Sequence, residues 1–502
     1  MSDSWNSGYV TDVEYTSGYF ISQSPQMLAL SCLINGYAVE APWDRRPMHY
    51  LELGCGRGAN ACIIAAANPL WQVTAIDFMP AAIADARRLA ADAGLDNISF
   101  IEADLTDFAE TAQGKALAEA DMITAHGVWS WVGDAVRAGI VRLAAAKLRA
   151  GGLMHLSYNA LPAQQGMLAL QRLMREVGIR MTSRSDRQAL VGRDIVQALA
   201  KAEATHLTST ATARDLLGRL DNMPASYLAH EYMNVDWHPF FHADVARALA
   251  AAKLEFAGSA RLVENFVDLL LTPAQKAIHD RFDDPALREL VIDTCITRIL
   301  RHDIYIRGAA RLSQRARDAA LGRVRLALAT APDQFAYVLK TQAGQAQLDQ
   351  AHYRPMVDAL AQGTCSLAEL SALAGGKGAG VNLPELAMVM AGTYQAMVVA
   401  DHAAIPSPRM HRFNQAMALR DVRADNPNAP SAMASLRLGA GYPMRADEVM
   451  VASRIGITGA LPDPAELAAE LLPQGAARDE FAGLIATMLR DRLPVWQRLG
   501  LV

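Results

Sequence analysis

The chain has 502 residues, of which 52% are hydrophobic, and a formal net charge of −5. This length predicts about three domains, and the apolar content excludes a disordered protein. Proteins that bind nucleic acid non-specifically usually have a basic surface, so the negative charge predicts no nucleic-acid partner.

The cysteines and the hydropathy pattern bear on the cellular compartment. The five cysteines are scattered and form no Cys-x-x-Cys pair, which disfavours a disulfide framework and fits a reducing environment. The first residues lack the basic and apolar regions of a signal peptide, and no stretch reaches the about 18 apolar residues of a membrane span. We therefore expect a cytoplasmic protein without membrane insertion.

A glycine-rich turn follows the first predicted strand. Residues 50–58 read Tyr-Leu-Glu-Leu-Gly-Cys-Gly-Arg-Gly, and a helix is expected directly after them. Gly54, Gly56 and Gly58 indicate a tight turn where the backbone passes close to a ligand. The spacing differs from the Gly-x-Gly-x-x-Gly of dinucleotide-binding enzymes. Glu52 precedes the glycines, and its charge suits an ammonium or sulfonium group better than a phosphate.

An acidic residue ends the second predicted strand. The apolar run at residues 72–76 leads into Asp77. A carboxylate at this strand tip is placed to accept hydrogen bonds from a ribose, which predicts a nucleoside cofactor. Asp77 could instead cap the helix that is expected to begin at Pro80.

Three more strands continue an alternation of strands and helices. They are predicted at residues 98–104, 121–125 and 153–159, with intervening helices that include residues 80–93 and 135–149. This alternation implies a mainly parallel sheet with helices on both faces. Ligands bind beyond the carboxyl ends of such strands, where the glycine turn and Asp77 fall.

These motifs resemble those of the class I S-adenosylmethionine (SAM) methyltransferases. The resemblance implies an α/β fold: a Rossmann-like, doubly wound and mainly parallel core, with a helical insertion and C-terminal winged-helix-like α+β domains. It implies SAM as cofactor, S-adenosylhomocysteine as product, and no metal. The cofactor-binding residues that it implies are Tyr15, Ser17, Glu52, Gly54, Cys55, Gly56, Asn60, Asp77, Phe78, Asp104, Leu105, Ala125 and His126. Of these, Asp104 is expected near the adenine amino group, although it could also cap the next turn.

Further segments narrow the resemblance to one subgroup. They are residues 15–28, 126–132, 157–162, 227–234 and 300–308. They look like methyltransferases that carry a so-called methyltransferase regulatory domain, and together they cover about residues 12–310. Members with a similar layout include rickettsial protein-lysine methyltransferases that modify outer membrane protein B. The resemblance implies a protein-lysine acceptor and a homodimer formed through an inserted element.

The predicted domain organisation follows from these segments. A helix at residues 242–252 and a strand at 254–260 are expected to return to the sheet, while residues 285–325 are predicted to be helical and 406–445 rich in loops. The predicted parts are an N-terminal cap over the cofactor site (1–48), the methyltransferase core (49–162 and 235–310), a helical insertion (163–234), a middle winged-helix-like domain (326–405) and a C-terminal domain (406–502).

Aromatic and histidine side chains are the candidates for the methyl-transfer site. Methyl transfer is an in-line displacement that needs a neutral nucleophile about 3 Å from the methyl group and the exclusion of water. His126 could be a base, a hydrogen-bonding partner of SAM or a structural residue. The two tryptophans could line the acceptor site or pack their loop onto the sheet. The candidates are His126, Trp129, Trp131 and Tyr158.

Other polar clusters are given structural roles. His230, His238 and His242 have irregular spacing, and Pro239 breaks any helical His-x-x-x-His face, so no metal site is predicted. His302 and its neighbour Asp303 are expected in a helix, within an ion-pair network.

Two alternative functions stay open. One is a small-molecule O- or N-methyltransferase of secondary metabolism. The other is a non-catalytic SAM-binding interaction protein.

Overall fold

The computed structural model describes residues 8–14, 18–44, 46–373, 382–401, 403–423, 430–471 and 477–502. Two of the predicted cofactor-binding residues, Tyr15 and Ser17, lie outside the described residues, as does the start of the predicted cap. Among the described residues, no helix has both the length and the apolar character needed to cross a membrane.

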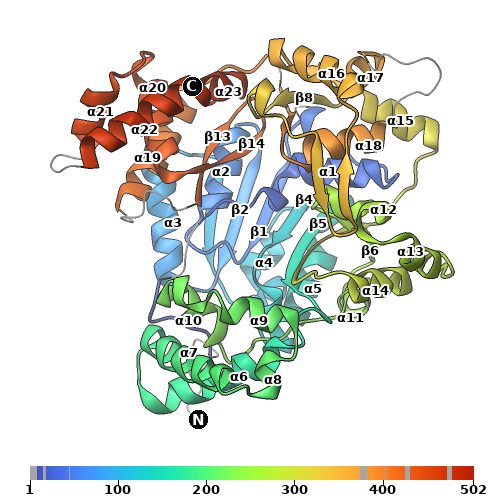
Figure 1. The fold of residues 1–502 in the computed structure, drawn as a ribbon, viewed down its shortest axis with the longest axis vertical. Coiled ribbons are helices and arrows are strands. Elements are labelled where there is room, and N and C mark those ends of the chain that lie inside the picture. Colours follow the sequence, from blue (N-terminus) through green and yellow to red (C-terminus); the bar gives the residue numbers. More distant parts are fainter. Residues whose placement is uncertain are drawn as a thin grey trace.

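A seven-stranded sheet in the order β3-β2-β1-β4-β5-β7-β6 forms the centre of the molecule (Figure 1). Only β7 runs against its neighbours, β5 and β6, and all other pairs are parallel. This topology confirms the predicted Rossmann-like methyltransferase core. The strands are β1 (His49–Leu53), β2 (Gln72–Asp77), β3 (Ile98–Glu102), β4 (Ala120–Ala125), β5 (Leu148–Asn159), β6 (Leu254–Ser259) and β7 (Leu300–Arg307).

Helices cover both faces of this sheet. One face packs against α1 (Pro25–Ile34), α2 (Ala59–Ala67) and α3 (Pro80–Ala93). The other packs against α4 (Ala112–Ala116), α5 (Asp134–Lys147), α11 (His242–Ala250) and α14 (Pro285–Cys295). Helix α2 is apolar except for Asn60 and is fully buried, because the C-terminal hairpin of β13 (Pro430–Ser435) and β14 (Ala440–Arg445) covers its outer side.

Residues 167–232, between β5 and β6, form a group of helices at one end of the sheet, drawn in green in Figure 1. Amphipathic sequences pack these helices around an apolar core of their own, which includes Leu170, Met174 and Leu228. This group lies beside the carboxyl ends of the strands. Its members are α6 (Met167–Met181), α7 (Ser185–Lys201), α8 (Thr205–Thr208), α9 (Ala211–Leu217) and α10 (Ala225–Tyr232).

The residues after β7 form two further groups. The first group surrounds an antiparallel sheet in the order β11-β8-β12 and shares its apolar core with α1. The winged-helix character expected for this group stays a prediction. The group contains α15 (Gln314–Gly322), β8 (Arg325–Leu328), β9 (Val338–Thr341), β10 (Gly344–Gln347), α16 (Gln350–Gln362), β11 (Cys365–Ser366), α17 (Leu367–Leu373), α18 (Leu383–Ala387) and β12 (Ala396–Val399). The second packs around the β13–β14 hairpin and contains α19 (Pro408–Arg423), α20 (Ala446–Thr458), α21 (Pro464–Leu471), α22 (Ala477–Asp491) and α23 (Leu493–Arg498).

Two predicted segments were wrong. Residues 300–307 form β7, so His302 and Asp303 lie on a strand and not in a helix. Residues 406–445 contain α19 and the hairpin rather than loops alone. The strand was missed because it buries charged side chains at alternate positions, which hides the apolar pattern of an interior strand.

A buried ion-pair network joins β7 to α14. Arg301, which is 1% exposed, donates from Nε to Asp303 and from Nη2 to Glu289 Oε2 at 2.7 Å. Its Nη1 donates to Asp293, which also accepts from Arg298. Burial acts to raise the pKa of Asp303, but Arg301, His242 and the hydroxyl of Tyr158 together outweigh it and hold that pKa well below its usual range.

Candidate active site

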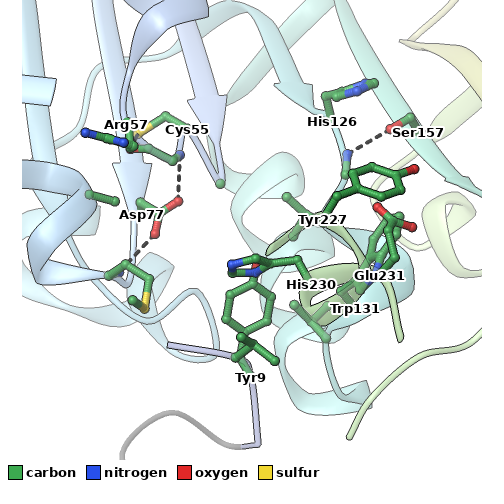
Figure 2. A pocket seen from close by; sticks show the side chains of 18 of the residues that line it. Tyr9, Cys55, Arg57, Asp77, His126, Trp131, Ser157, Tyr227, His230 and Glu231 are labelled. Atoms are coloured by element: carbon green, nitrogen blue, oxygen red, sulfur yellow. Dashed lines mark hydrogen bonds between the residues drawn. The ribbon is translucent and has the colours of Figure 1, made fainter. Parts of the chain in front are cut away.

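A cavity of about 700 Å³ lies at the carboxyl ends of β1, β2, β4 and β5. The N-terminal segment closes one side of it, the turns after the strands form its floor, and α6, α9 and α10 contribute the opposite wall. Figure 2 shows these walls facing one another across an open space. The cavity lies where the sequence predicts the ligand.

The glycine turn after β1 has the backbone that its sequence demands. Gly54, Gly56 and Gly58 have φ values of +68°, +51° and +74°. At Gly54 a Cβ atom would lie 2.3 Å from Val128 Cγ2, whereas at Gly56 it would meet nothing within 4 Å. Gly56 therefore presents bare backbone to the cavity, as a closely approaching ligand requires.

Asp77 links the glycine turn to the entry of α3, and its predicted contact with a ribose stays a prediction. Its Oδ2 accepts from the backbone N–H of Gly56 at 2.8 Å, and its Oδ1 accepts from that of Met79 at 2.9 Å (Figure 2). Burial raises its pKa, and these backbone N–H groups act in the opposite direction. The carboxylate thus fixes the turn and the entry to α3 while lining the cavity, where it is placed for a ribose.

One end of the cavity is rich in buried acceptors. Glu52 Oε2 accepts from Asn60 Nδ2 at 2.9 Å. Among the described residues, Asn60 Oδ1 and Gln23 Oε1 have no hydrogen-bond partner although both are buried. Buried oxygens without donors are costly, so this end of the cavity calls for a ligand that brings N–H groups and positive charge. The ammonium group of SAM fits it, with Glu52, Asn60 and Gln23 as the residues that would hold it.

The affinity for SAM is expected to depend on pH through the ionisation of Glu52. Burial raises the pKa of Glu52 to about 7, against hydrogen bonds from Asn60 and Gln23. A bound cation favours the carboxylate, so we expect the affinity for SAM to rise about tenfold from pH 6 to 7.5 and to fall again above about pH 8, where the amino group of SAM loses its proton. Calorimetric titrations across this range test the expectation. Glu52→Gln should remove the rise, and an equal pH slope in both proteins would contradict the assignment.

The loop after β4 forms the next wall. Gly127 N donates to Ser157 Oγ at 2.8 Å, which ties the loop to β5. The ring of His126 packs against Phe20 at 3.9 Å between centroids, and Figure 2 shows it directed away from Tyr9 and His230. Burial, with a smaller contribution from Arg261, lowers the pKa of His126 to about 3. The imidazole is therefore neutral near pH 7.

Several predicted residues do line the cavity. Asp104 is among them, and its Oδ1 also accepts from Thr106 N at 2.7 Å, so it caps its own turn as well. The predicted residues found at the cavity wall are Glu52, Gly54, Cys55, Gly56, Asn60, Asp77, Phe78, Asp104, Leu105, His126 and Trp131.

Three predicted residues lie away from the cavity. Tyr158 is fully buried on the opposite face of the sheet, where its hydroxyl donates to Asp303 Oδ2 at 2.6 Å. Trp129 packs in the core against Phe240, with 6.3 Å between ring centroids. Ala125 is buried in the same core. These positions correct the predicted catalytic roles of Tyr158 and Trp129, which are packing residues.

The residues that form the cavity wall opposite Asp77 were not predicted from the sequence. Tyr227 and Glu231 come from α10 and face the cavity beside Trp131 (Figure 2). Tyr9 lies edge-on to Phe78, with 5.5 Å between centroids, and its ring is 5.9 Å from that of His230. Residues 227–234 stand out in the sequence as a motif. Their position at the carboxyl ends of the strands depends on the packing of the inserted helices, which the sequence does not show.

Comparisons with known proteins agree with this geometry. Residues 51–154 match a model described as a methyltransferase domain, and residues 224–307 match a predicted methyltransferase regulatory domain. The Synechocystis protein sll1526 is 31% identical over 400 residues, which are 79% of this chain and 75% of that protein. The Rickettsia prowazekii protein RP789 is 27% identical over 236 residues, 44% of this chain and 41% of that protein.

Solved structures show the same fold over the whole chain. PKMT2 from Rickettsia typhi in complex with AdoHcy (S-adenosylhomocysteine) superposes with a TM-score of 0.70 and 15% identity, covering 97% of this chain and 100% of that one. A second structure of PKMT2 gives a TM-score of 0.66. The sheet order, the glycine turn with Asp77, and the matches to both domain models lead to one assignment. The chain belongs to the class I SAM-dependent methyltransferases that carry a methyltransferase regulatory domain.

Proposed function

We propose that this methyltransferase transfers the methyl group of SAM to lysine side chains of a protein. The observation that carries the proposal is the composition of the wall opposite Asp77. There a carboxylate, Glu231, lies beside the rings of Tyr227 and Trp131 within the same cavity as Glu52. A carboxylate attracts an ammonium group, and aromatic rings accept its alkyl chain and its methylated product.

The same wall favours the neutral amine that must attack. A lysine loses its proton more readily when its amine leaves water for an apolar environment. Tyr227 and Trp131 supply such an environment, while Glu231 can hold the incoming ammonium before the proton departs. SAM, when bound, supplies the electrophilic methyl group. The residues of the chain hold and orient the amine and keep water from the site.

A labelling experiment separates this proposal from the two alternatives. Purified protein is incubated with methyl-labelled SAM and cell extract, and the label is followed in protein bands and in the organic extract. Label on protein lysines supports the proposal, and label in the organic extract points to a small-molecule acceptor. SAM binding without transfer of label to either fraction points to a non-catalytic SAM-binding protein.

The role of Glu231 predicts a selective defect. Glu231→Gln removes the charge that attracts the ammonium group, and we expect kcat/KM for the protein substrate to fall about tenfold to a hundredfold. The affinity for S-adenosylhomocysteine should stay unchanged because Glu231 lies on the opposite wall from Asp77. Asp194→Asn on α7 is the matched control, since this carboxylate is exposed and pairs with Arg193. Equal activity in both variants would show that Glu231 does not bind the acceptor.

We propose a homodimer formed through residues 163–234, whose helices expose apolar side chains in two neighbouring elements. These side chains are Leu168, Ile179, Met181, Ile195 and Leu199. A cytoplasmic location, a protein partner and the absence of a nucleic-acid partner belong to the same proposal.

A further inference from the structure

Three histidines that are far apart in the sequence meet on one face of the central sheet. His155 lies in β5, His302 lies in β7, and His126 directly follows β4. The register pairs Thr124 with His155 and Ser157 with His302, so all three imidazoles project from the face that α1 covers. One ligand nitrogen from each ring can be chosen so that all three lie within 4.8 Å of one another.

Five of the six ring nitrogens of this cluster have no hydrogen-bond partner in the described part of the chain. They are Nδ1 of His126 and both ring nitrogens of His155 and His302, and all five are buried. His155 is 0% exposed and His302 is 4% exposed. Buried polar atoms are nearly always satisfied, by protein, water or an ion. Each neutral imidazole carries one lone-pair nitrogen, so this cluster can present three lone pairs to one bound species.

The arrangement of the rings suits a metal ion. The three rings are nearly parallel, with interplanar angles of 15°, 20° and 12° and ring centroids 5.4, 5.7 and 6.1 Å apart. Imidazole nitrogens at about 2 Å from one zinc ion would place their ring centroids about 5 Å apart, so the rings would have to approach one another by up to about 1.1 Å to close the set. Imidazole is the commonest metal-binding side chain, and each of these three residues offers one ligand nitrogen to a shared position.

The charges around the cluster allow a cation. Arg261 is the guanidinium whose field reaches His126 and His302, but it is partly exposed and lies 3.7 Å from the carboxylate of Glu264. Asp303, on the other face of the sheet, acts in the opposite direction on His155 and His302. We propose that His126, His155 and His302 form a binding site for one divalent transition-metal ion, for which zinc is the first candidate.

The position of the site suggests what the ion does. Of the three histidines, only His126 lines the cavity, so the ion would lie behind the cavity wall. It would join the loop after β4 to β5 and β7, and so hold the wall that carries His126 and Trp131. It would also satisfy one nitrogen of each ring and leave the second nitrogens of His155 and His302 to ordered water. The proposed role of the ion is to hold these elements together, and it does not depend on the identity of the methyl acceptor.

Metal analysis of the full-length protein tests the proposal. The protein is stripped with a chelator, dialysed against zinc chloride, freed of excess metal, and analysed by mass spectrometry of the metal. We expect about one zinc per chain in the natural protein and a loss of that zinc in His155→Asn and in His302→Asn. In parallel, Co²⁺ added to the stripped natural protein should give the visible absorption of nitrogen-ligated cobalt, and zinc should raise its melting temperature.

Controls separate this site from adventitious binding. His206 is exposed on α8, so His206→Asn should keep the bound zinc. Binding of S-adenosylhomocysteine shows which variants have folded. Equal zinc in the natural protein and in both folded cluster variants would overturn the proposal. Should the variants not fold, a natural protein that retains no zinc, shows no cobalt absorption and has an unchanged melting temperature would overturn it as well, and would assign the five nitrogens to water.

Discussion

Replacing Arg301 with methionine is expected to lower the free energy of unfolding by about 3–5 kcal/mol. Arg301 is the cation that Asp293, Asp303 and Glu289 share inside the protein. Its removal leaves buried carboxylates with too little positive charge, and that cost exceeds the value of any one ion pair. The substitution should destabilise the central sheet, because the network joins β7 to α14 and, through Tyr158, to β5.

Chemical unfolding measured by fluorescence and circular dichroism checks this expectation. Arg454→Met is the matched control, because Arg454 pairs with Glu470 at the surface, where an ion pair contributes at most about 1 kcal/mol. A loss below about 1 kcal/mol for Arg301→Met would show that water or protonation of the carboxylates relieves the buried charge.

Replacing Asp77 with alanine is expected to weaken SAM binding by about 1–3 kcal/mol, through lost charged hydrogen bonds. The structure adds a second reason for this loss. Asp77 also accepts from Gly56 N, so the variant loosens the turn that must lie against the ligand. Asp77→Asn keeps an acceptor for that N–H but removes the charge, and we expect it to bind SAM with intermediate affinity.

Calorimetric titration with SAM measures all three proteins. Asp96→Asn serves as the control, since Asp96 is an exposed carboxylate that pairs with Arg409 outside the cavity. A folded Asp77→Ala variant that binds SAM with the affinity of the natural protein would show that Asp77 does not bind the ribose.

The glycine turn after β1 and the position of Asp77 were predictable because their signals are local. Strand, glycine turn and helix follow one another within residues 49–67, and Asp77 ends the next strand. Helix α3 begins and ends at the predicted residues, because Pro80 suits its first turn and Gly94 adopts the left-handed conformation that ends it. Such features need no knowledge of distant contacts.

The residues that were misplaced depend on register and on distant packing. Alternation along β5 puts Ser157 at the cavity and Tyr158 on the opposite face, and a sequence does not show which face receives the ligand. The partnership of His155 and His302 arises from the antiparallel pairing of β5 with β7, across more than 140 intervening residues. No spacing rule for metal ligands could detect it.

A structure of the protein with S-adenosylhomocysteine tests the central assignment most directly. The ligand should lie across the carboxyl ends of β1 and β2, with its ribose at Asp77, its amino group among Glu52, Asn60 and Gln23, and its sulfur directed toward the loop that carries His126 and Trp131. Density for the ligand at another place, or none at saturating concentration, would contradict the account.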